Sequence, residues 1–495
     1  MSITPVLLTT DLLVWLLVAA VLAYAINARR HPHLRAPWVK VRRNGIAMAC
    51  ATVLATYAVV GLLDSLHFRM TMPAAAGAAP QAPAARGQPA AKPQLSVEVK
   101  SLLDVLISAG LGPMAGKSEK TYSAPLATHS FAKESMERPD GTQTREFPRL
   151  TTGGAHLKDP ADAGTDLAWR AAAGVGAGFA VWVVICLALC LAIGRLKQPL
   201  RTWRNIWHDT TTAPWRPVLL TLLVICIFAA IAVTVGSRYH LFGTDKVGQD
   251  VLTLSLKSIR TGLLIGTLTT MVMLPFAVLA GLAAGYFRGW VDDVIVYIYT
   301  TLSSIPGVLL IAAAVLMTQV YIDTHPENFQ TTLERADFRL LALCVILGVT
   351  SWTGLCRLLR GEALKLRELD YIQAAQAFGV AKLRVLSRHM LPNVMHLITI
   401  SAVMDFSGMV LAEAVLSYVG VGVDPTMNSF GTMINAARFE ISREPVVWWL
   451  LAAAFFFMLT LVLAANLFAD AVQEAFDPRR VTRRARPRLL EAKRA

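Results

Sequence analysis

Nine long apolar blocks constrain the fold of this 495-residue sequence more than any other feature. Each block has about 20 mostly apolar residues, the length that a helix needs to cross the hydrocarbon core of a bilayer. Only helices and closed barrels satisfy every backbone polar group in lipid, so we expect an all-α polytopic membrane protein. The first block has no basic segment ahead of it, and we interpret it as a span rather than a signal peptide. The predicted spans are about 7–26, 45–64, 169–193, 217–236, 260–284, 293–318, 338–356, 394–417 and 447–469.

The formal net charge of +14 comes from basic residues that flank these spans. They gather in segments 27–44, 195–216, 357–393 and 471–495, whereas segment 319–337 is acidic. Basic loops stay on the cytoplasmic side of a membrane. With nine spans, one orientation places every strongly basic segment inside, with the N-terminus outside and the C-terminus inside. We therefore expect a multi-pass protein of the bacterial inner membrane that contacts lipid and binds no nucleic acid.

Residues 1–214 are predicted to form an N-terminal accessory membrane module of three spans. Between its second and third spans lies an insert, residues 65–168, which this orientation places outside the cell. The Ala/Pro-rich stretch 73–94 is typical of a linker, because it has too few large apolar residues for a core. Residues 95–112 have the pattern of an amphipathic helix. The rest of the insert is polar and rich in Gly, Pro and Thr, and we expect it to be loosely ordered.

No catalytic or metal-binding motif is found in the sequence. Gly116-Lys117-Ser118 has the letters that end a phosphate-binding loop, but that motif needs a glycine at position 111, which is Leu111. We therefore expect the chain not to hydrolyse ATP by itself. The six cysteines lie in or at the ends of apolar spans and lack the spacing of a zinc site or a disulfide framework.

The most informative segment is the cytoplasmic loop between the seventh and eighth spans. Residues 361–378 are predicted to form a helix that ends at Gly379, because glycine commonly stops helices. A second amphipathic helix, about 381–390, is predicted to end before Pro392. In the first of these helices, the small residues Ala374 and Ala375 allow another surface to approach closely. A hairpin of this kind suits docking to a cytoplasmic partner.

This segment resembles the EAA loop of ABC importer permeases. That pattern is Glu-Ala-Ala, three residues, glycine, and then nine residues to an apolar-x-Leu-Pro ending. Gln373, Ala374 and Ala375 match its first part, with Gln373 in place of the acid. Gly379 matches the glycine, and Leu391 and Pro392 match the end, with His389 at a position that is usually aliphatic.

Further motifs resemble the second permease subunit of dipeptide, oligopeptide and nickel importers. They occur in the family's order, and the resemblance covers about 215–480, followed by a basic tail at 481–495. The matching segments are 242–251 (FGTDKVGQDV), 285–293 (GYFRGWVDD), Ile305-Pro306, 413–422 (EAVLSYVGVG), Asn466-Leu467, Asp470 and Asp477-Pro478-Arg479.

The resemblance implies that the last six spans form an ABC importer permease core. The implied partners are a second homologous permease subunit, two ATPase subunits and an extracytoplasmic solute-binding protein. The chain itself would bind no cofactor, since ATP and Mg are used by the partner ATPases. It would provide the translocation path for peptides or related small solutes, with nickel chelates, opines or peptide-like antibiotics as alternatives. Without the resemblance, a secondary transporter, a membrane-embedded enzyme and a scaffold or sensor are the other classes to consider.

Two carboxylates, Asp405 and Glu413, lie two turns apart in the eighth predicted span. Ionisable groups inside a bilayer usually face the bundle interior or a water-filled path. One interpretation is that both residues line or gate the translocation path. The other is that Glu413 caps a loop near the outer end of the span while Asp405 pairs within the bundle.

Overall fold

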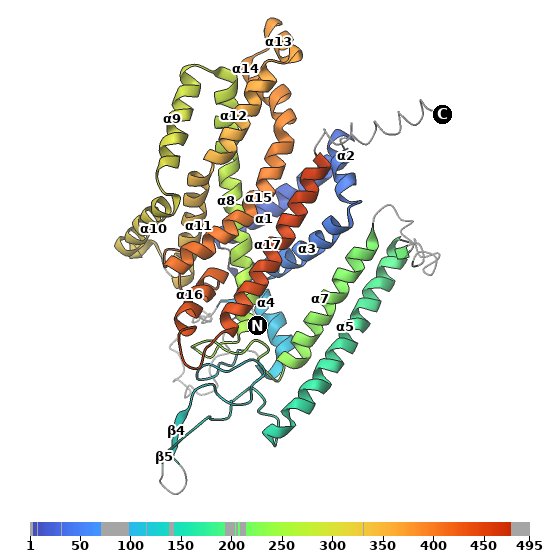
Figure 1. Ribbon diagram of the computed structural model, residues 1–495, viewed down its shortest axis with the longest axis vertical. Coiled ribbons are helices and arrows are strands. Elements are labelled where there is room, and N and C mark those ends of the chain that lie inside the picture. The colour runs from blue at the N-terminus through green and yellow to red at the C-terminus, as the bar shows by residue number, and fades with distance from the viewer. Residues whose placement is uncertain are drawn as a thin grey trace, which may run out of the picture.

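The computed structural model describes residues 3–6, 8–30, 32–70, 99–114, 116–137, 143–193, 203, 206–207, 214–329 and 331–476 (Figure 1). Within these residues, nine helices are long and apolar enough to cross a membrane, which confirms the predicted all-α polytopic fold. The Ala/Pro-rich stretch 73–94, residues 477–479 of the last family motif and the tail 481–495 lie outside the described residues.

The first part of the chain contains membrane helices, short strands and the small helix of the insert. Its elements are β1 (Ile3–Val6), α1 (Thr9–Arg30), α2 (Pro32–Val41), α3 (Gly45–Asp64), β2 (His67–Met70), β3 (Lys100–Ser101), α4 (Leu102–Leu111), β4 (Glu134–Glu137), β5 (Gln143–Glu146) and α5 (Ala163–Ile193). Strands β1, β2 and β3 form one small antiparallel sheet, and β4 and β5 form a separate hairpin.

The second part is almost entirely helical. Its elements are α7 (Trp215–Gly236), α8 (Val251–Phe287), α9 (Trp290–Ser304), α10 (Gly307–Thr324), α11 (Thr332–Ser351), α12 (Thr353–Arg367), α13 (Asp370–Ala377), α14 (Lys382–Val385), a π-helical turn (Leu386–Met390), α15 (Leu391–Val419), α16 (Phe430–Glu440) and α17 (Trp449–Phe476). Helix α8 is central and packs against α3, α11, α12 and α15.

The predicted sixth span, 293–318, is wrong as a single helix. The structure divides it into α9 and α10, and only α10 meets the length and hydropathy of a membrane span. The break is at Ile305, whose backbone is extended, followed by Pro306. Proline has no N–H to donate, and its ring disfavours a helical conformation in the residue before it.

Close packing of α8 on α12 depends on two glycines one helical turn apart. A Cβ atom built on Gly285 would lie 2.5 Å from Cβ of Ala363, and one built on Gly281 would lie 2.8 Å from the carbonyl oxygen of Cys356. Only glycine fits at such distances. Small residues four apart allow the same close approach of helices in other membrane proteins.

The N-terminal spans pack directly on this core. Helix α3 contacts α7, α8 and α17, and α1 contacts α8 and α11. Asp11 of α1 is buried, and its carboxylate accepts a hydrogen bond of 2.6 Å from Arg260 of α8. Thr9 of α1 donates one of 2.5 Å to Asp337 of α11. These polar contacts join α1 to two core helices.

Two opposite ends of the molecule carry its loops (Figure 1). At one end lie α13, α14 and the corner between α8 and α9, and we call this the loop end. At the other lie α4, the β4–β5 hairpin and the segment between α7 and α8, and we call this the insert end. Helix α2 and the last turns of α17 lie at the loop end.

The insert is held by backbone hydrogen bonds to the segment between α7 and α8. The amide of Glu119 donates to the carbonyl of Gly248 at 3.0 Å, and the amide of Leu126 donates to His240 at 2.9 Å. In the reverse direction, the amide of Thr244 donates to Ser123 at 3.1 Å. The expectation of a loosely ordered insert is therefore wrong for residues 119–137 and 143–157, which use the core in place of an apolar centre of their own.

Candidate functional site

The loop between α12 and α15 contains the residues that resemble the EAA pattern. Gln373 and Ala374 are exposed on α13, while Ala375 packs partly against the core. The side-chain amide of Gln373 donates to the backbone carbonyl of Glu368 at 3.3 Å. The predicted helix 361–378 is interrupted, because α12 ends at Arg367 and α13 begins at Asp370. The structure thus brings the three residues together on a separate two-turn helix.

Gly379 makes the turn that follows α13. Its φ of +73° lies in the left-handed region that glycine adopts without strain. Its amide donates to the carbonyl of Gln376 at 3.0 Å, and the amide of Val380 donates to Ala375 at 3.1 Å. No other atom lies within 4 Å of the place where a side chain at Gly379 would begin. The turn therefore depends on backbone conformation alone, and its outer surface is open.

Buried apolar residues anchor the inner side of the loop to the helices, and exposed apolar residues cover its outer side. Ile372, Val385 and Met390 are fully buried in the cluster formed with α8 and α12. By contrast, Phe378 is 87% exposed and Leu383 is 75% exposed. A rigid base with exposed apolar side chains above it is an arrangement typical of an interaction surface.

The far end of the loop differs from the sequence prediction. Pro392 does not close a helix; it lies in the first turn of α15, directly after the π-helical turn Leu386–Met390. Proline is tolerated there because the wider turn removes the regular backbone hydrogen bond that its nitrogen could not make. Leu391 is partly buried against the core, and Pro392 is exposed. The loop is consequently continuous with the long membrane helix α15.

The corner between α8 and α9 supports the loop through three polar contacts. Arg360 of α12 makes two hydrogen bonds to Asp292, of 2.5 and 2.7 Å. Arg367 donates to the carbonyl of Tyr286 at 3.0 Å, and Arg288 pairs with Glu368 at 2.5 Å. Sequence reasoning identified 285–293 only as a family motif. Its supporting role depends on pairing across 68 to 81 positions of the sequence, which local spacing does not reveal.

The two membrane carboxylates of α15 have different surroundings. Glu413 is buried, and its Oε1 accepts hydrogen bonds from Ser417 at 2.7 Å and from Ser429 at 2.9 Å. Ser429 begins α16, so Glu413 connects α15 to the loop that precedes α16. Asp405 is half-buried and has no hydrogen-bond or ion-pair partner among the described residues. The structure does not bring the two carboxylates into one cluster.

Sequence reasoning missed a buried carboxylate at the insert end. Glu119 accepts hydrogen bonds from the amides of Thr151 at 3.0 Å, Thr152 at 2.7 Å and Gly153 at 3.2 Å, and from both threonine hydroxyls. Burial acts to raise the pKa of Glu119, but the hydrogen bonds from Thr152 and Thr151 outweigh it and hold the pKa at about 2. No sequence motif marks this residue, because its partners lie more than 30 positions away.

The described residues contain no group of three or more side chains that could hold a metal ion. All six cysteines are free thiols. What the arrangement offers is therefore an anchored, exposed loop, buried polar contacts within a helical bundle and a structured insert at the opposite end.

Comparison with known proteins gives a consistent result. Residues 277–482 match the family described as the binding-protein-dependent transport system inner membrane component. The oligopeptide transport system permease protein OppC of Mycobacterium bovis is 30% identical over 239 residues, which cover 48% of this chain and 76% of that protein. OppC of Haemophilus influenzae is 26% identical over 310 residues, 58% of this chain and 92% of that protein. The glutathione transport system permease protein GsiD of Pectobacterium atrosepticum is 30% identical over 243 residues, 49% of this chain and 74% of that protein.

Proposed function

Because the chain belongs to the family of permease subunits of peptide-type ABC importers, we propose that it forms part of the translocation path of an importer for short peptides. Its family makes it a transport subunit and not an enzyme, as predicted. The names of its relatives, oligopeptide and glutathione transport permeases, support short peptides as the solute class.

The observation that carries this proposal is the anchored loop at the loop end. In our proposal, Gln373, Ala374, Ala375 and Gly379 face a groove on a cytoplasmic ATPase subunit, and Phe378 and Leu383 enter that groove. Their exposure supports this role, since a water-soluble surface rarely leaves such side chains bare without a partner.

Movement of the ATPase would reach the membrane by two routes from this loop. One is the π-helical turn and Leu391-Pro392, which continue into α15. The other is α12, which is fixed to the α8–α9 corner through Arg360 and Asp292. The ATPases bind and hydrolyse ATP with Mg, and this chain converts their closure into a change in helix packing. Asp405 and Glu413 lie on the helix that would move.

The complete importer would contain a second permease subunit, two ATPase subunits and an extracytoplasmic solute-binding protein. We place the loop end in the cytoplasm and the insert end outside, with the N-terminus outside and the C-terminus inside. The basic residues of segments 27–44 and 357–393 support this orientation. Residues 215–480 act as the permease domain. The accessory module 1–214 supports it, because Asp11 and Arg260 form a buried pair between the two.

Purification of the tagged chain from its native membrane in mild detergent, followed by mass spectrometry, tests the proposal. We expect a second permease and ATPase subunits with the wild type, and loss of the ATPases, with the second permease retained, in Gly379→Asp. A captured solute-binding protein would identify the solute class. Absence of any ATPase, under conditions that keep a known importer intact, would contradict the proposed function.

A further inference from the structure

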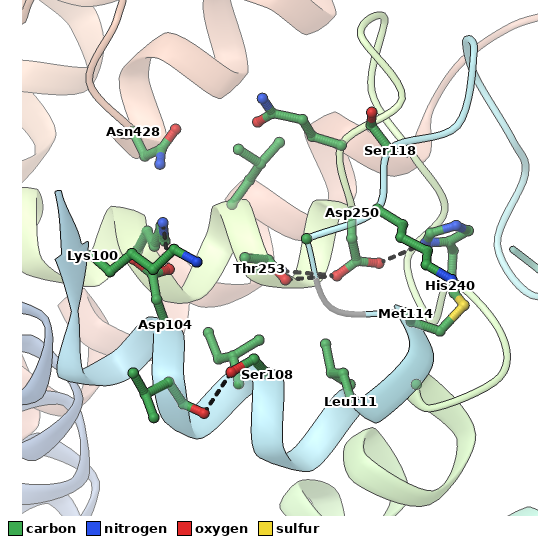
Figure 2. Close-up of a pocket in the computed structure, with 18 of the residues that line it drawn as sticks. Lys100, Asp104, Ser108, Leu111, Met114, Ser118, His240, Asp250, Thr253 and Asn428 are labelled. Carbon is green, nitrogen blue, oxygen red and sulfur yellow. Dashed lines mark hydrogen bonds and ion pairs between the residues drawn. The ribbon is translucent and has the colours of Figure 1, made fainter. Parts of the chain in front are cut away.

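A cavity of about 720 Å³ lies at the insert end, between α4 and the first turns of α8 (Figure 2). Helix α4 runs along one wall with Asp104, Ser108 and Leu111, and Asn428 lies on the opposite side. His240 and Asp250, from the segment between α7 and α8, close a third side. More than half of the lining residues, including those of α4, belong to the insert 65–168, so the cavity depends on the insert.

The lining of the cavity combines apolar and polar side chains. Apolar side chains come mainly from the insert: Val99, Val105, Ile107, Leu111 and Met114. Polar groups come from both the insert, including Lys100, Asp104 and Lys117, and the core, including Gln249, Thr253 and Asn428. The volume lies within the range of about 300–1,000 Å³ that is usual for small-molecule sites, which also combine apolar walls with a few fixed polar groups.

Some charged side chains of the cavity form ion pairs, and others have no charged partner in the part of the chain that the structure describes. Asp104 bonds to Lys257 at 2.6 Å and is fixed by a capping box with Ser101 at the start of α4. Burial acts to raise the pKa of Asp104, but its hydrogen bonds with Lys257 and Ser101 lower it below its usual value, so the carboxylate is ionised at neutral pH. Lys100 and Lys117 are exposed and have no charged partner among the described residues. Two ammonium groups at the cavity are therefore available to an anion.

Asn428 connects the cavity to the carboxylate of α15. Its backbone carbonyl accepts a hydrogen bond of 2.7 Å from Thr261 of α8. The next residue, Ser429, donates to Glu413 at 2.9 Å. An occupant that contacts Asn428 is thus one residue away from the contact that joins α15 to the loop before α16.

We propose that this cavity binds a short peptide with a free carboxylate terminus. Lys100 or Lys117, which lie beyond opposite ends of α4, holds the carboxylate, and the apolar face of α4 accepts a side chain. The peptide class rests on the proposed function. The cavity would hold the peptide at the insert end, on its way to the membrane path.

Cysteine protection tests this site without any need for transport. Ser108 lines the cavity and is exposed, so Ser108→Cys is expected to react with a membrane-impermeant maleimide in the complete complex in phosphatidylcholine nanodiscs without ATP. Trialanine should slow this labelling, and trialanine amide, which lacks the carboxylate, should not. Lys158→Cys, exposed on the insert but outside the cavity, is the control and should react equally with and without peptide.

A charge variant identifies the groups that recognise the carboxylate. In the Ser108→Cys background, Lys100→Gln with Lys117→Gln should raise the trialanine concentration for half-protection by about tenfold, the loss expected for charge-assisted hydrogen bonds. Lys158→Gln should leave it unchanged. Equal protection by trialanine and its amide, or no effect of the lysine variants, would overturn the proposal.

Two other outcomes separate this site from the proposed function and from lipid. Absence of protection together with normal ATP-driven uptake overturns the peptide site and leaves the importer function standing. Protection that persists in a complex without ATP-driven peptide uptake supports the site and contradicts the importer function. Protection that appears only when phosphatidylglycerol replaces phosphatidylcholine, and never with trialanine, assigns the cavity to a lipid headgroup and overturns the proposal.

Discussion

The two ends of this molecule are stabilised in opposite ways. At the loop end, apolar anchors such as Ile372 and Val385 are buried beneath a turn whose outer face exposes Phe378 and Leu383. At the insert end, hydrogen bonds to Glu119 and along the 238–250 segment join distant parts of the chain. The loop end thus has a fixed base and an exposed apolar surface, whereas the insert end is joined around Glu119 by internal hydrogen bonds. This difference suits a partner-binding surface at one end and a rigid frame at the other.

The largest expected effect is at the turn of the loop. Gly379→Asp should reduce peptide uptake by about thirtyfold or more, the size of an interface hot spot, because it places a charged side chain on the docking surface. Membrane insertion should persist, because a side chain at Gly379 meets no neighbour among the described residues and the strain of its φ of +73° is confined to the turn. Uptake by whole cells, with the amount of inserted protein measured in parallel, checks this. Gly379→Ala, which imposes the same backbone strain without the charge, is the matched control and should be less impaired. Normal uptake in Gly379→Asp would contradict docking at this surface.

A comparable effect, confined to the insert end, is expected from Glu119→Gln. The amide cannot accept all of the hydrogen bonds that the carboxylate accepts, so the local free energy of opening should fall by about 2–3 kcal/mol, a roughly 30- to 140-fold increase in opening. Hydrogen exchange at residues 149–153 should accelerate while exchange in α13 is unchanged. Glu134→Gln, which alters an exposed pair with Lys120 on the same insert, should have almost no effect. Faster exchange at both ends would show that the two ends are not independent.

The same carboxylate predicts a dependence on pH. Hydrogen bonds lower the pKa of Glu119 from its ordinary value of 4.5 to about 2 in the folded protein, so the unfolded insert binds the proton more readily. Its stabilisation is fully present above about pH 4.5 and is lost as the pH falls toward 2. In the wild type, hydrogen exchange at residues 149–153, corrected for intrinsic rates, should become faster as the pH falls from about 4.5 toward 2. The Glu119→Gln variant should lack this rise; an equal rise in both would assign it to another group.

A smaller effect is expected in the membrane. Asp405→Ala should reduce uptake several-fold without loss of insertion, because a half-buried carboxylate without a partner suits a path or gate better than a structural contact. Asp405→Asn, which retains the size and polarity, should be less impaired. Unchanged uptake in Asp405→Ala would defeat the pathway interpretation.

The smallest effect is expected from a surface pair at the loop end. Arg288 and Glu368 are 46% and 59% exposed, so Arg288→Ala should change stability by less than about 1 kcal/mol. Arg360→Ala should cost more, because Arg360 binds Asp292 through two hydrogen bonds and both side chains are more buried. The melting temperatures of the two purified variants show which substitution destabilises the protein more. A larger loss for Arg288→Ala would mean that the outer pair, and not the inner one, supports the loop.

Particular elements show what was predictable. Residues 45–64 were predicted as a span and form α3 with the same bounds, because hydropathy and length alone determine such a helix. The loop was recognised because its residues lie close in sequence, with Gly379 at the turn as expected. The predicted helix 381–390 instead continues into α15 through a π-helical turn. The residues that support the loop, Arg360 and Asp292, were not identified as partners.

The sequence by itself determined the number of apolar spans, the family and the position of the loop, since these depend on composition and on short patterns of neighbouring residues. Tertiary structure decided which groups donate hydrogen bonds to Glu119 and brought Asp11 to Arg260 across 249 positions. It also decided where α4 closes a cavity. Each of these contacts joins groups that are far apart in the chain. Their pairing depends on the packing of whole helices, and no local pattern of residues encodes it.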